Sequence, residues 1–152
     1  MRRKLRVILK AGCVLVNLKD QKVALVCRNG NYSFPKGHLE DGETIIECAT
    51  RETKEETGHN CHIISDSQIG ILKYKNSSEK EISVYFYLAI DDGITIDKIQ
   101  EKDKELTVWE FYKNIDNKLS YQILKDFWND VKDQVEEIIN EYCEKNMEDE
   151  ER

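Results

Sequence analysis

The sequence predicts an α/β domain in which a mostly mixed sheet is covered by two substantial helices. Short segments with the apolar patterning of strands outnumber those with helical patterning. Two segments, residues 44–57 and the stretch from residue 121 onward, carry apolar residues at helical spacing. The chain has 152 residues, the size of one domain. We therefore expect a single domain over residues 1–143 and a charged, frayed tail over residues 144–152.

The predicted strands share short length, apolar content and flanking polar turns. In the first of them, Val7, Leu9, Ala11, Cys13 and Leu15 alternate in phase. The strand predicted over residues 81–90 lacks strict alternation of apolar and polar residues, so we expect both of its faces to be covered. In chain order, the predicted strands are residues 5–18, 22–27, 62–65, 69–73, 81–90 and 107–109.

The two predicted helices each have one apolar stripe. In residues 44–57 the stripe consists of Ile46, Ala49 and Thr53, and Gly58 suits the left-handed conformation that ends many helices. The second helix begins near Tyr121, and its stripe packs on the sheet. That stripe contains Ile123, Leu124, Phe127, Trp128, Val131, Val135 and Ile138.

The composition limits the functions that the chain can have. Its net charge of −7 argues against binding to extended nucleic acid, because phosphate backbones attract basic surfaces. The five cysteines are scattered without zinc-binding spacing, which is typical of reduced thiols in a cytoplasmic protein. No apolar run approaches membrane-spanning length. We expect a monomer or a weak dimer that contacts neither extended nucleic acid nor membrane.

Three glutamates on the first helix carry the strongest functional signal. At roughly 100° per residue, Glu52, Glu55 and Glu56 fall on one face, where like charges destabilise an isolated helix. A divalent cation would neutralise them, and carboxylate oxygens suit Mg²⁺ or Mn²⁺. A solvent-exposed charged helix is the simpler interpretation of the three glutamates alone. Glu43 lies eight residues before Arg51, so this pair is expected to fasten the preceding loop to the helix.

The same segment resembles the Nudix box, G-x5-E-x7-R-E-U-x-E-E-x-G-U, in which U is a bulky aliphatic residue. Every fixed position is matched, and only the two packing positions Thr53 and His59 depart from the pattern. The matching residues are Gly37, Glu43, Arg51, Glu52, Glu55, Glu56 and Gly58. The resemblance implies the Nudix α/β/α sandwich, with a catalytic loop-helix-loop and a C-terminal helix.

The resemblance also implies Mg²⁺-dependent hydrolysis of a nucleoside diphosphate linked to another group. Glu52, Glu55 and Glu56 would bind the metal, and Glu52 or Glu55 could instead orient or deprotonate the attacking water. The motif does not determine which carboxylate is the base. Glu101 and Glu105, in a later predicted loop, are further candidates.

The residues before and after the box resemble those of dinucleoside polyphosphate hydrolases, whose box commonly begins Pro-Lys-Gly-His. On this resemblance Lys36, with Gly37, contacts a bridging phosphate, and His38 donates to a phosphate oxygen near the scissile bond. Lys80 corresponds to a phosphate-binding lysine, and an exposed turn lysine is its alternative interpretation. Tyr87 and Tyr121 are candidates to stack on an adenine ring, although tyrosines at such positions often serve only in packing.

The leading hypothesis is therefore asymmetric cleavage of diadenosine tetraphosphate to ATP and AMP. Three alternatives within the superfamily are hydrolysis of diphosphoinositol polyphosphates, of nucleoside triphosphates and of RNA 5′ ends. The acidic net charge fits a densely anionic inositol substrate or a long RNA less well. A non-catalytic nucleotide sensor is a further alternative, but the box keeps all of its glutamates.

Overall fold

A computed structural model describes residues 7–95 and 106–150 of the chain. These residues form eight strands and three α-helices, with one short 3-10 segment before the second helix. The strands are β1 (Val7–Asn17), β2 (Lys22–Arg28), β3 (Asn31–Ser33), β4 (Lys36–His38), β5 (His59–Ile63), β6 (Gly70–Lys75), β7 (Glu81–Thr95) and β8 (Leu106–Phe111). The helical segments are α1 (Ile45–Thr57), η2 (Tyr112–Asn114), α2 (Ile115–Lys118) and α3 (Gln122–Glu150).

All eight described strands belong to one mixed sheet. Its central path runs β3-β2-β1-β7-β5, while β4 pairs with β1, β6 with β7 and β8 with β2. The β1–β7 pair is parallel over ten residues, from Val7 opposite Glu81 to Val16 opposite Ile90, and the other pairs are antiparallel. The β1–β7 pair is therefore the longest pairing at the centre of the sheet.

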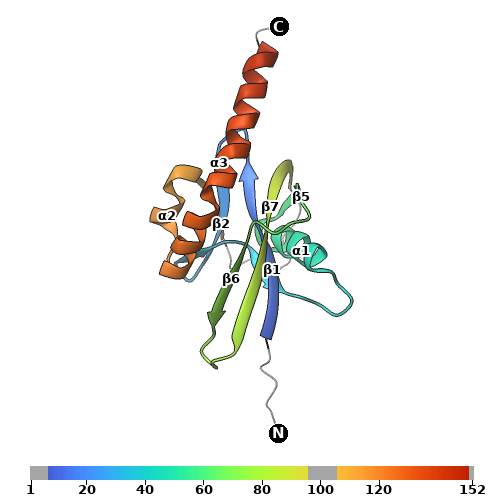
Figure 1. Cartoon of the computed structure of the whole chain (residues 1–152), viewed down its shortest axis with the longest axis vertical. Helices are drawn as coiled ribbons and strands as arrows, with labels where there is room; N and C mark the ends of the chain where they lie inside the picture. The colour runs from blue at the N-terminus through green and yellow to red at the C-terminus, as the bar shows by residue number, and fades with distance from the viewer. Residues whose placement is uncertain (1–6, 96–105, 151–152) are drawn as a thin grey trace.

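The helices cover both faces of this sheet, as the sequence predicted. Figure 1 shows α1 on one side of the strands, with α2 and α3 on the other. The larger core lies under α3 and contains Phe34, Phe86, Phe127 and Trp128, whose rings pack against one another. The smaller core lies under α1 and contains Cys13, Cys48 and Ala49. The predicted α/β/α sandwich is confirmed.

Several element boundaries differ from the predicted ones. β5 begins three residues earlier than expected, β7 runs five residues further to Thr95, and the pairs made by β3 and β4 were not predicted. The helix α3 continues through residues 144–150, where the charge pattern predicted a frayed tail. At the C-terminal end of the predicted stripe on α3, Ile139 is fully buried, whereas the predicted Ile138 is only partly buried. No helix among the described residues is long and apolar enough to cross a membrane.

The strand β4 lies directly beside the middle of β1, and this close approach fixes the loop that precedes α1. Gly12 pairs with Lys36, and Cys13 N donates to Pro35 O at 3.3 Å. A Cβ atom on Gly12 would overlap the carbonyl oxygen of Pro35, so the chain can pass here only because Gly12 has no side chain. This contact places Lys36, Gly37 and His38 in front of α1.

Candidate active site

The helix α1 has a well-defined beginning and end. Thr44 is its N-cap: its Oγ1 accepts from Glu47 N at 3.1 Å, and Glu47 Oε1 accepts from Thr44 N at 3.2 Å. This capping box satisfies two backbone donors at the start of the helix. Gly58, with φ of 72°, ends the helix by donating to Lys54 O. The helix that carries the glutamates is therefore fixed at both ends.

Arg51 holds the loop before α1 against the helix. Its Nε lies 2.6 Å from Glu43 Oε2 and its Nη2 lies 3.0 Å from Glu43 Oε1, so the predicted pair forms and is bidentate. Nη2 also donates to the backbone oxygen of His38 at 2.9 Å. The hydrogen bonds from Arg51 hold the pKa of Glu43 at about 2, and those from Glu43 raise the pKa of Arg51. Both groups therefore stay charged near neutral pH.

The three glutamates of the helix do not all point the same way. Glu52 and Glu56 are buried, with 5% and 7% of their surface exposed, and both line a cavity of about 430 Å³. Glu56 Oε2 accepts from Lys36 N at 3.0 Å. Glu55 does not line this cavity, and its Oε2 lies 3.2 Å from Arg51 Nη1. The predicted carboxylate face is thus present, with two members in the cavity and the third held beside it.

Glu52 comes very close to the backbone of the loop in front of it. A Cβ atom on Gly37 would overlap the carboxylate group of Glu52. Arg51 Nη1 meanwhile donates to Glu52 Oε1 at 2.7 Å. Gly37 is therefore required by the position of the Glu52 carboxylate, which explains a glycine at the first position of the box.

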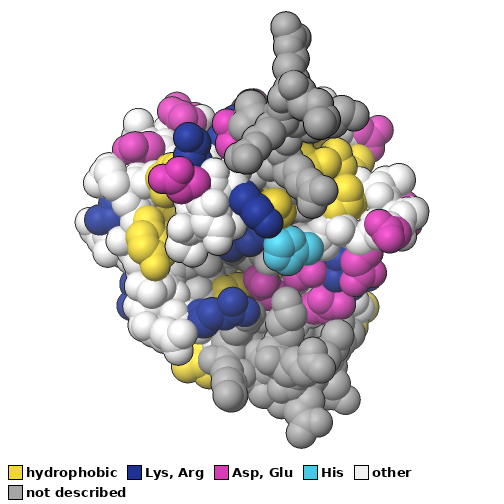
Figure 2. Space-filling view, turned by 90° about the horizontal axis from the view of Figure 1, so that it is seen from below, with side chains coloured by type: hydrophobic (Ala, Val, Ile, Leu, Met, Phe, Trp, Pro, Cys, Tyr) yellow, Lys and Arg dark blue, Asp and Glu magenta, His cyan; other side chains and the backbone are white. Residues whose placement is uncertain are grey.

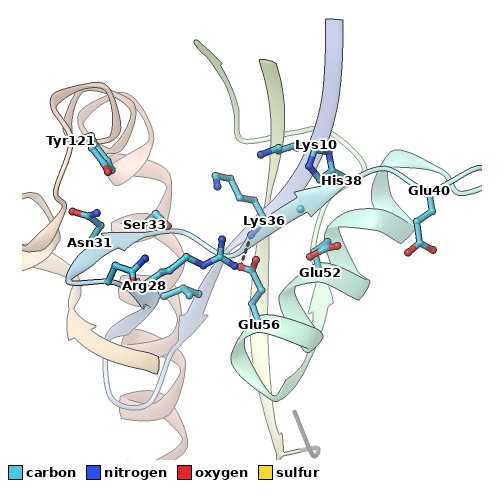
Figure 3. Close-up of a pocket in the computed structure, with 13 residues that line it drawn as sticks. Lys10, Arg28, Asn31, Ser33, Lys36, His38, Glu40, Glu52, Glu56 and Tyr121 are labelled. Atoms are coloured by element: carbon cyan, nitrogen blue, oxygen red, sulfur yellow. Dashed lines mark hydrogen bonds between the residues drawn. The ribbon is translucent and has the colours of Figure 1, made fainter. Parts of the chain in front are cut away.

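Basic side chains from three strands face these carboxylates. Lys10 comes from β1, Arg28 from the end of β2 and Lys36 from β4, and all three line the cavity (Figure 3). The sequence analysis anticipated Lys36 and missed Lys10 and Arg28. No local motif marks those two residues, since only the pairing of β1 with β4 and the end of β2 brings them to Lys36.

Burial lowers the pKa of two of these side chains, Lys36 and Lys10. Desolvation lowers the pKa of Lys36, and the nearby charges of Lys10 and Arg28 lower it further, while Glu56 and Glu52 act in the opposite direction. Desolvation likewise lowers the pKa of Lys10, assisted by Arg28 and opposed by the two glutamates. The cations are thus close enough to repel one another and to be stabilised by anions. On the outer surface, Figure 2 shows basic, acidic and histidine side chains gathered side by side.

The donor set fits a hard divalent cation. Glu52 and Glu56 place carboxylates one helical turn apart in the cavity, with Glu55 beside them. Within residues 7–95 and 106–150, no three acidic, histidine or cysteine side chains converge closely enough to enclose a metal by themselves. Mg²⁺ commonly binds to one or two carboxylates and keeps water and substrate phosphate as its other ligands. The buried pair meets that requirement.

The remaining predicted residues divide into two groups. His38 and Tyr121 line the cavity together with Lys36 and Gly37. Lys80 lies in the exposed turn before β7 and is not among the residues that line the cavity. Tyr87 is 5% exposed and packs in the core under α1, so the structure does not bring it to the cavity. The prediction that Tyr87 stacks on an adenine ring is therefore wrong, because this tyrosine lies on the face of β7 that α1 covers.

A second hollow adjoins the first. It has a volume of about 470 Å³ and shares Ser33, Lys36 and Tyr121 with the charged cavity. Its other lining residues are mostly apolar or aromatic, and Tyr121 is 52% exposed at the junction. Those residues are Leu72, Tyr74, Lys75, Ile123 and Leu124. The sequence analysis missed Tyr74 and assigned Ile123 to the buried stripe, but Ile123 is 39% exposed.

Thr53 and His59, the two residues that depart from the box pattern, are both partly or fully buried in the structure. His59 Nδ1 lies 3.2 Å from Asp91 Oδ1, and its ring packs edge-on against Trp109 with centroids 5.2 Å apart. The histidine thus joins the end of α1 to β7 and β8. Thr53 is fully buried, and its hydroxyl has no hydrogen-bond partner within the described part of the chain. Glu101 and Glu105, the other candidate bases, lie outside the described residues.

These features define an α/β/α protein whose capped helix presents buried carboxylates to a basic cavity. The chain matches the NUDIX domain over residues 8–127. It therefore belongs to the Nudix family, as the resemblance of the box implied.

Individual relatives differ in how much of their length the chain matches. A Caenorhabditis elegans protein named for the nudix hydrolases is 34% identical over 109 residues, which covers 67% of this chain but only 27% of that protein. The chain thus spans about a quarter of the length of this curated relative. The RNA pyrophosphohydrolase of Pelagibacter ubique is 30% identical over 152 residues, which covers 85% of this chain and 91% of that protein.

The fold is shared with solved structures. A Caenorhabditis elegans Ap4A hydrolase, in a binary complex, superposes with a TM-score of 0.67 at 22% identity. The superposition covers 81% of this chain and 93% of that one. At this level of identity the similarity shows the Nudix fold.

Proposed function

We propose that the protein is a Mg²⁺-dependent hydrolase that cleaves diadenosine tetraphosphate asymmetrically to ATP and AMP. The observation that carries this proposal is the continuity of the two hollows. One combines buried carboxylates with three cations, and the other is apolar and aromatic, and Ser33, Lys36 and Tyr121 line both. A substrate that fills both hollows has a charged phosphate chain joined to a flat apolar group.

The phosphate chain lies in the basic cavity. Lys36, Lys10 and Arg28 offset the charge of its oxygens, and His38 at the cavity wall donates to an oxygen near the bond that is cleaved. Mg²⁺ at Glu52 and Glu56, with Glu55 as a further ligand, would polarise the phosphoryl oxygens and lower the pKa of the attacking water. Glu43 and Arg51 keep the loop and helix in the geometry that this chemistry needs.

The reaction consumes one water molecule. The water oxygen forms a bond to phosphorus, the bond from that phosphorus to its bridging oxygen breaks, and a carboxylate accepts the proton from water. Glu52 and Glu55 are both candidates for that base. The departing nucleotide leaves as a phosphate anion, and the cations of the cavity stabilise its charge.

The base of one nucleoside stacks on Tyr121, and Tyr74 lies in the same hollow. The Ap4A hydrolase among the solved relatives supports this substrate class, since the two chains share a fold. A cytoplasmic location, where thiols stay reduced, is part of this proposal. We propose a monomer or weak dimer as the active form.

Removal of pyrophosphate from RNA 5′ ends is the second candidate. The Pelagibacter RNA pyrophosphohydrolase favours it, because that match covers nearly the whole of both chains. The net charge of −7 favours the small dinucleotide over a long RNA.

A substrate panel separates the two candidates. The purified protein would be incubated with Mg²⁺ and a dinucleoside polyphosphate, a nucleotide sugar, a deoxynucleoside triphosphate, an inositol pyrophosphate or 5′-triphosphorylated RNA, and the products identified by chromatography. We expect ATP and AMP from diadenosine tetraphosphate at the highest kcat/KM. Pyrophosphate release from RNA at a higher kcat/KM would instead assign the second function.

A further inference from the structure

The turn that joins β2 to β3 consists of Asn29 and Gly30. Arg28 pairs with Asn31 across this turn, and the φ angles of Asn29 and Gly30 are 52° and 79°. Two consecutive positive φ angles are typical of a type I′ turn, which favours Asn-Gly because both residues tolerate that conformation. The sequence contains no other Asn-Gly pair. The fold therefore places the chain's one Asn-Gly pair at the tip of this hairpin.

Both residues of the turn are open to solvent. Asn29 and Gly30 are exposed, and a Cβ atom built on Gly30 would meet no atom within 4 Å. Three residue pairs join β2 to β3, so the tip of this short hairpin opens locally at small cost in free energy. Water and base therefore reach the backbone nitrogen of Gly30, and no side chain on that residue shields it.

An asparagine followed by glycine is prone to an intramolecular reaction, and asparagine is a thermolabile residue for this reason. Once base removes its proton, the Gly30 nitrogen forms a bond to the side-chain carbonyl carbon of Asn29. The bond from that carbon to the amide nitrogen breaks, and the nitrogen leaves as ammonia. Water then opens the resulting succinimide ring at either of its carbonyl carbons. Opening at the former side-chain carbon gives isoaspartate or aspartate according to which ring bond breaks, so that the sum of the steps consumes one water molecule and releases one ammonia.

We propose that Asn29 is a site of spontaneous deamidation, and that this modification lowers the activity of the adjoining cavity. Asn29 lines the charged cavity, and so do Arg28 and Asn31 on either side of the turn. The inference rests on the proposed function only for the negative charge of the substrate. The modification needs no enzyme, because the attacking and the attacked groups belong to neighbouring residues.

The aspartate product changes the charge of the cavity. Asp-Gly also suits a type I′ turn, so the hairpin keeps its shape. The new carboxylate lies one residue from Arg28 at the cavity wall, where it offsets the charge of that cation and repels phosphate.

The isoaspartate product changes the backbone. Its main chain runs through the Cβ and Cγ atoms, which lengthens a two-residue turn and shifts the pairing of Arg28 with Asn31. Figure 3 shows the Arg28 side chain reaching toward Glu56 of α1. A shift at the end of the hairpin therefore moves a cation away from the carboxylates of the cavity.

The first test measures the modification in the full-length protein. The wild type would be incubated in mildly alkaline buffer, and the peptide that contains residue 29 would be followed by mass spectrometry with fragmentation that separates aspartate from isoaspartate. Asn76 is the internal comparison, because it precedes a small residue but its Oδ1 accepts from Ser78 N at 2.9 Å and from Lys80 N at 3.0 Å. We expect Asn29 to convert at least about tenfold faster, since the hydrogen bonds of Asn76 must open before it reacts. Equal rates, or an Asn29 that persists, would overturn the proposal.

The second test measures the consequence for the cavity. Asn29→Gly removes the reacting side chain and keeps a pair of residues that suits the turn. After the same incubation, kcat/KM of the wild type for diadenosine tetraphosphate should fall at least about threefold from its own starting value, while that of Asn29→Gly should stay at its own starting value. Asn29→Asp carries the charge from the start, so its KM should not rise further on incubation as steeply as that of the wild type. Thermal melts before and after incubation confirm that each protein is folded. An equal decline in the wild type and Asn29→Gly, or a converted wild type with unchanged kcat/KM, would overturn the link to activity.

The outcome is separable from the proposed function. If diadenosine tetraphosphate is cleaved but Asn29 persists, the modification is wrong and the enzymatic function stands. If no dinucleoside polyphosphate is cleaved but Asn29 converts, the substrate is wrong and the modification stands. In that case its effect on the cavity is measured as the affinity for imidodiphosphate in the presence of Mg²⁺, which should fall in the converted protein.

Discussion

Gly37 and Glu52 occupy adjoining positions that leave no space for a side chain between them. A Cβ atom at Gly37 would overlap the Glu52 carboxylate, and the backbone of Gly37 does not have the positive φ that would by itself require glycine. The glycine is there because the carboxylate needs the space. The glycine at the first position of the box and the first helical glutamate of the box therefore depend on each other: the glutamate can occupy its place only if Gly37 has no side chain.

Gly37→Ala should abolish activity while leaving the protein folded. The methyl group meets the end of a flexible side chain, so Glu52 can rotate away at small cost, but its carboxylate then leaves the cavity. We expect a drop in kcat of at least about 100-fold, with a change in unfolding free energy below about 1 kcal/mol. Activity assays and urea unfolding measure the two quantities.

Gly93→Ala is the matched control for this substitution. Gly93 has open space around it but a φ of +80°, so alanine is strained there by about 1–2 kcal/mol without touching the cavity. This variant should lose stability and keep its activity. An active Gly37→Ala protein would show that the position of Glu52 does not depend on the glycine.

The pair formed by Glu43 and Arg51 should stabilise the protein in a pH-dependent way. The pKa of Glu43 is lowered from 4.5 to about 2, so its ionisation contributes stability above pH 4.5 that is lost as pH falls toward 2. Glu43→Gln should cost about 1–2 kcal/mol at pH 7. Urea unfolding at pH 7, 4 and 2.5 should show this difference shrinking as the solution becomes more acidic. A difference that stays constant over that range would contradict the assigned role.

The buried hydroxyl of Thr53 should destabilise the fold. Its Oγ1 has no hydrogen-bond partner among the residues that the structure describes, whereas Thr57 Oγ1 donates to Thr53 O at 2.6 Å and accepts from His59 N at 3.2 Å. Thr53→Val should therefore raise the unfolding free energy by about 1 kcal/mol, and Thr57→Val should lower it by a similar amount. Urea unfolding of the two variants compares them directly. Equal destabilisation by both would mean that the Thr53 hydroxyl is satisfied.

Tyr121 should contribute to substrate affinity through its ring. Tyr121→Ala removes the half-exposed aromatic surface where the two hollows meet, so we expect KM for diadenosine tetraphosphate to rise about tenfold with kcat little changed. Tyr121→Phe keeps the ring and should keep the KM. Tyr142→Ala, on a part of α3 outside both hollows, serves as the control. A normal KM in Tyr121→Ala would remove the stacking role.

The part of the site that the sequence predicts is the part that one helix and its loop determine. Glu43, Arg51, Glu52 and Glu56 lie at offsets that helical geometry and a tight loop convert directly into neighbours. Glu55 shows the limit of this reasoning, since the same face also offers it a contact with Arg51 instead of the cavity.

The residues that were missed depend on the sheet. Lys10, Arg28 and Tyr74 come from β1, β2 and β6, and only strand pairing brings them to Lys36. Tyr87 was misassigned for the same reason, because the position of α1 over β7 decides which face of that strand is covered. The two faces of a fully covered strand look alike in sequence, so this distinction has no local signal.

The central claim is that the cavity carboxylates support Mg²⁺-dependent phosphoanhydride cleavage, and Glu56→Gln tests it most directly. The amide can still accept from Lys36 N, so the local structure should persist while the charge that binds the metal is lost. The measurement is the rate of Mg²⁺-dependent release of ATP and AMP from diadenosine tetraphosphate, with Glu141→Gln on the exposed face of α3 as the control. A fall of at least about 100-fold in folded Glu56→Gln, with wild-type activity in the control, is the predicted result. An unchanged rate in folded Glu56→Gln would contradict the account.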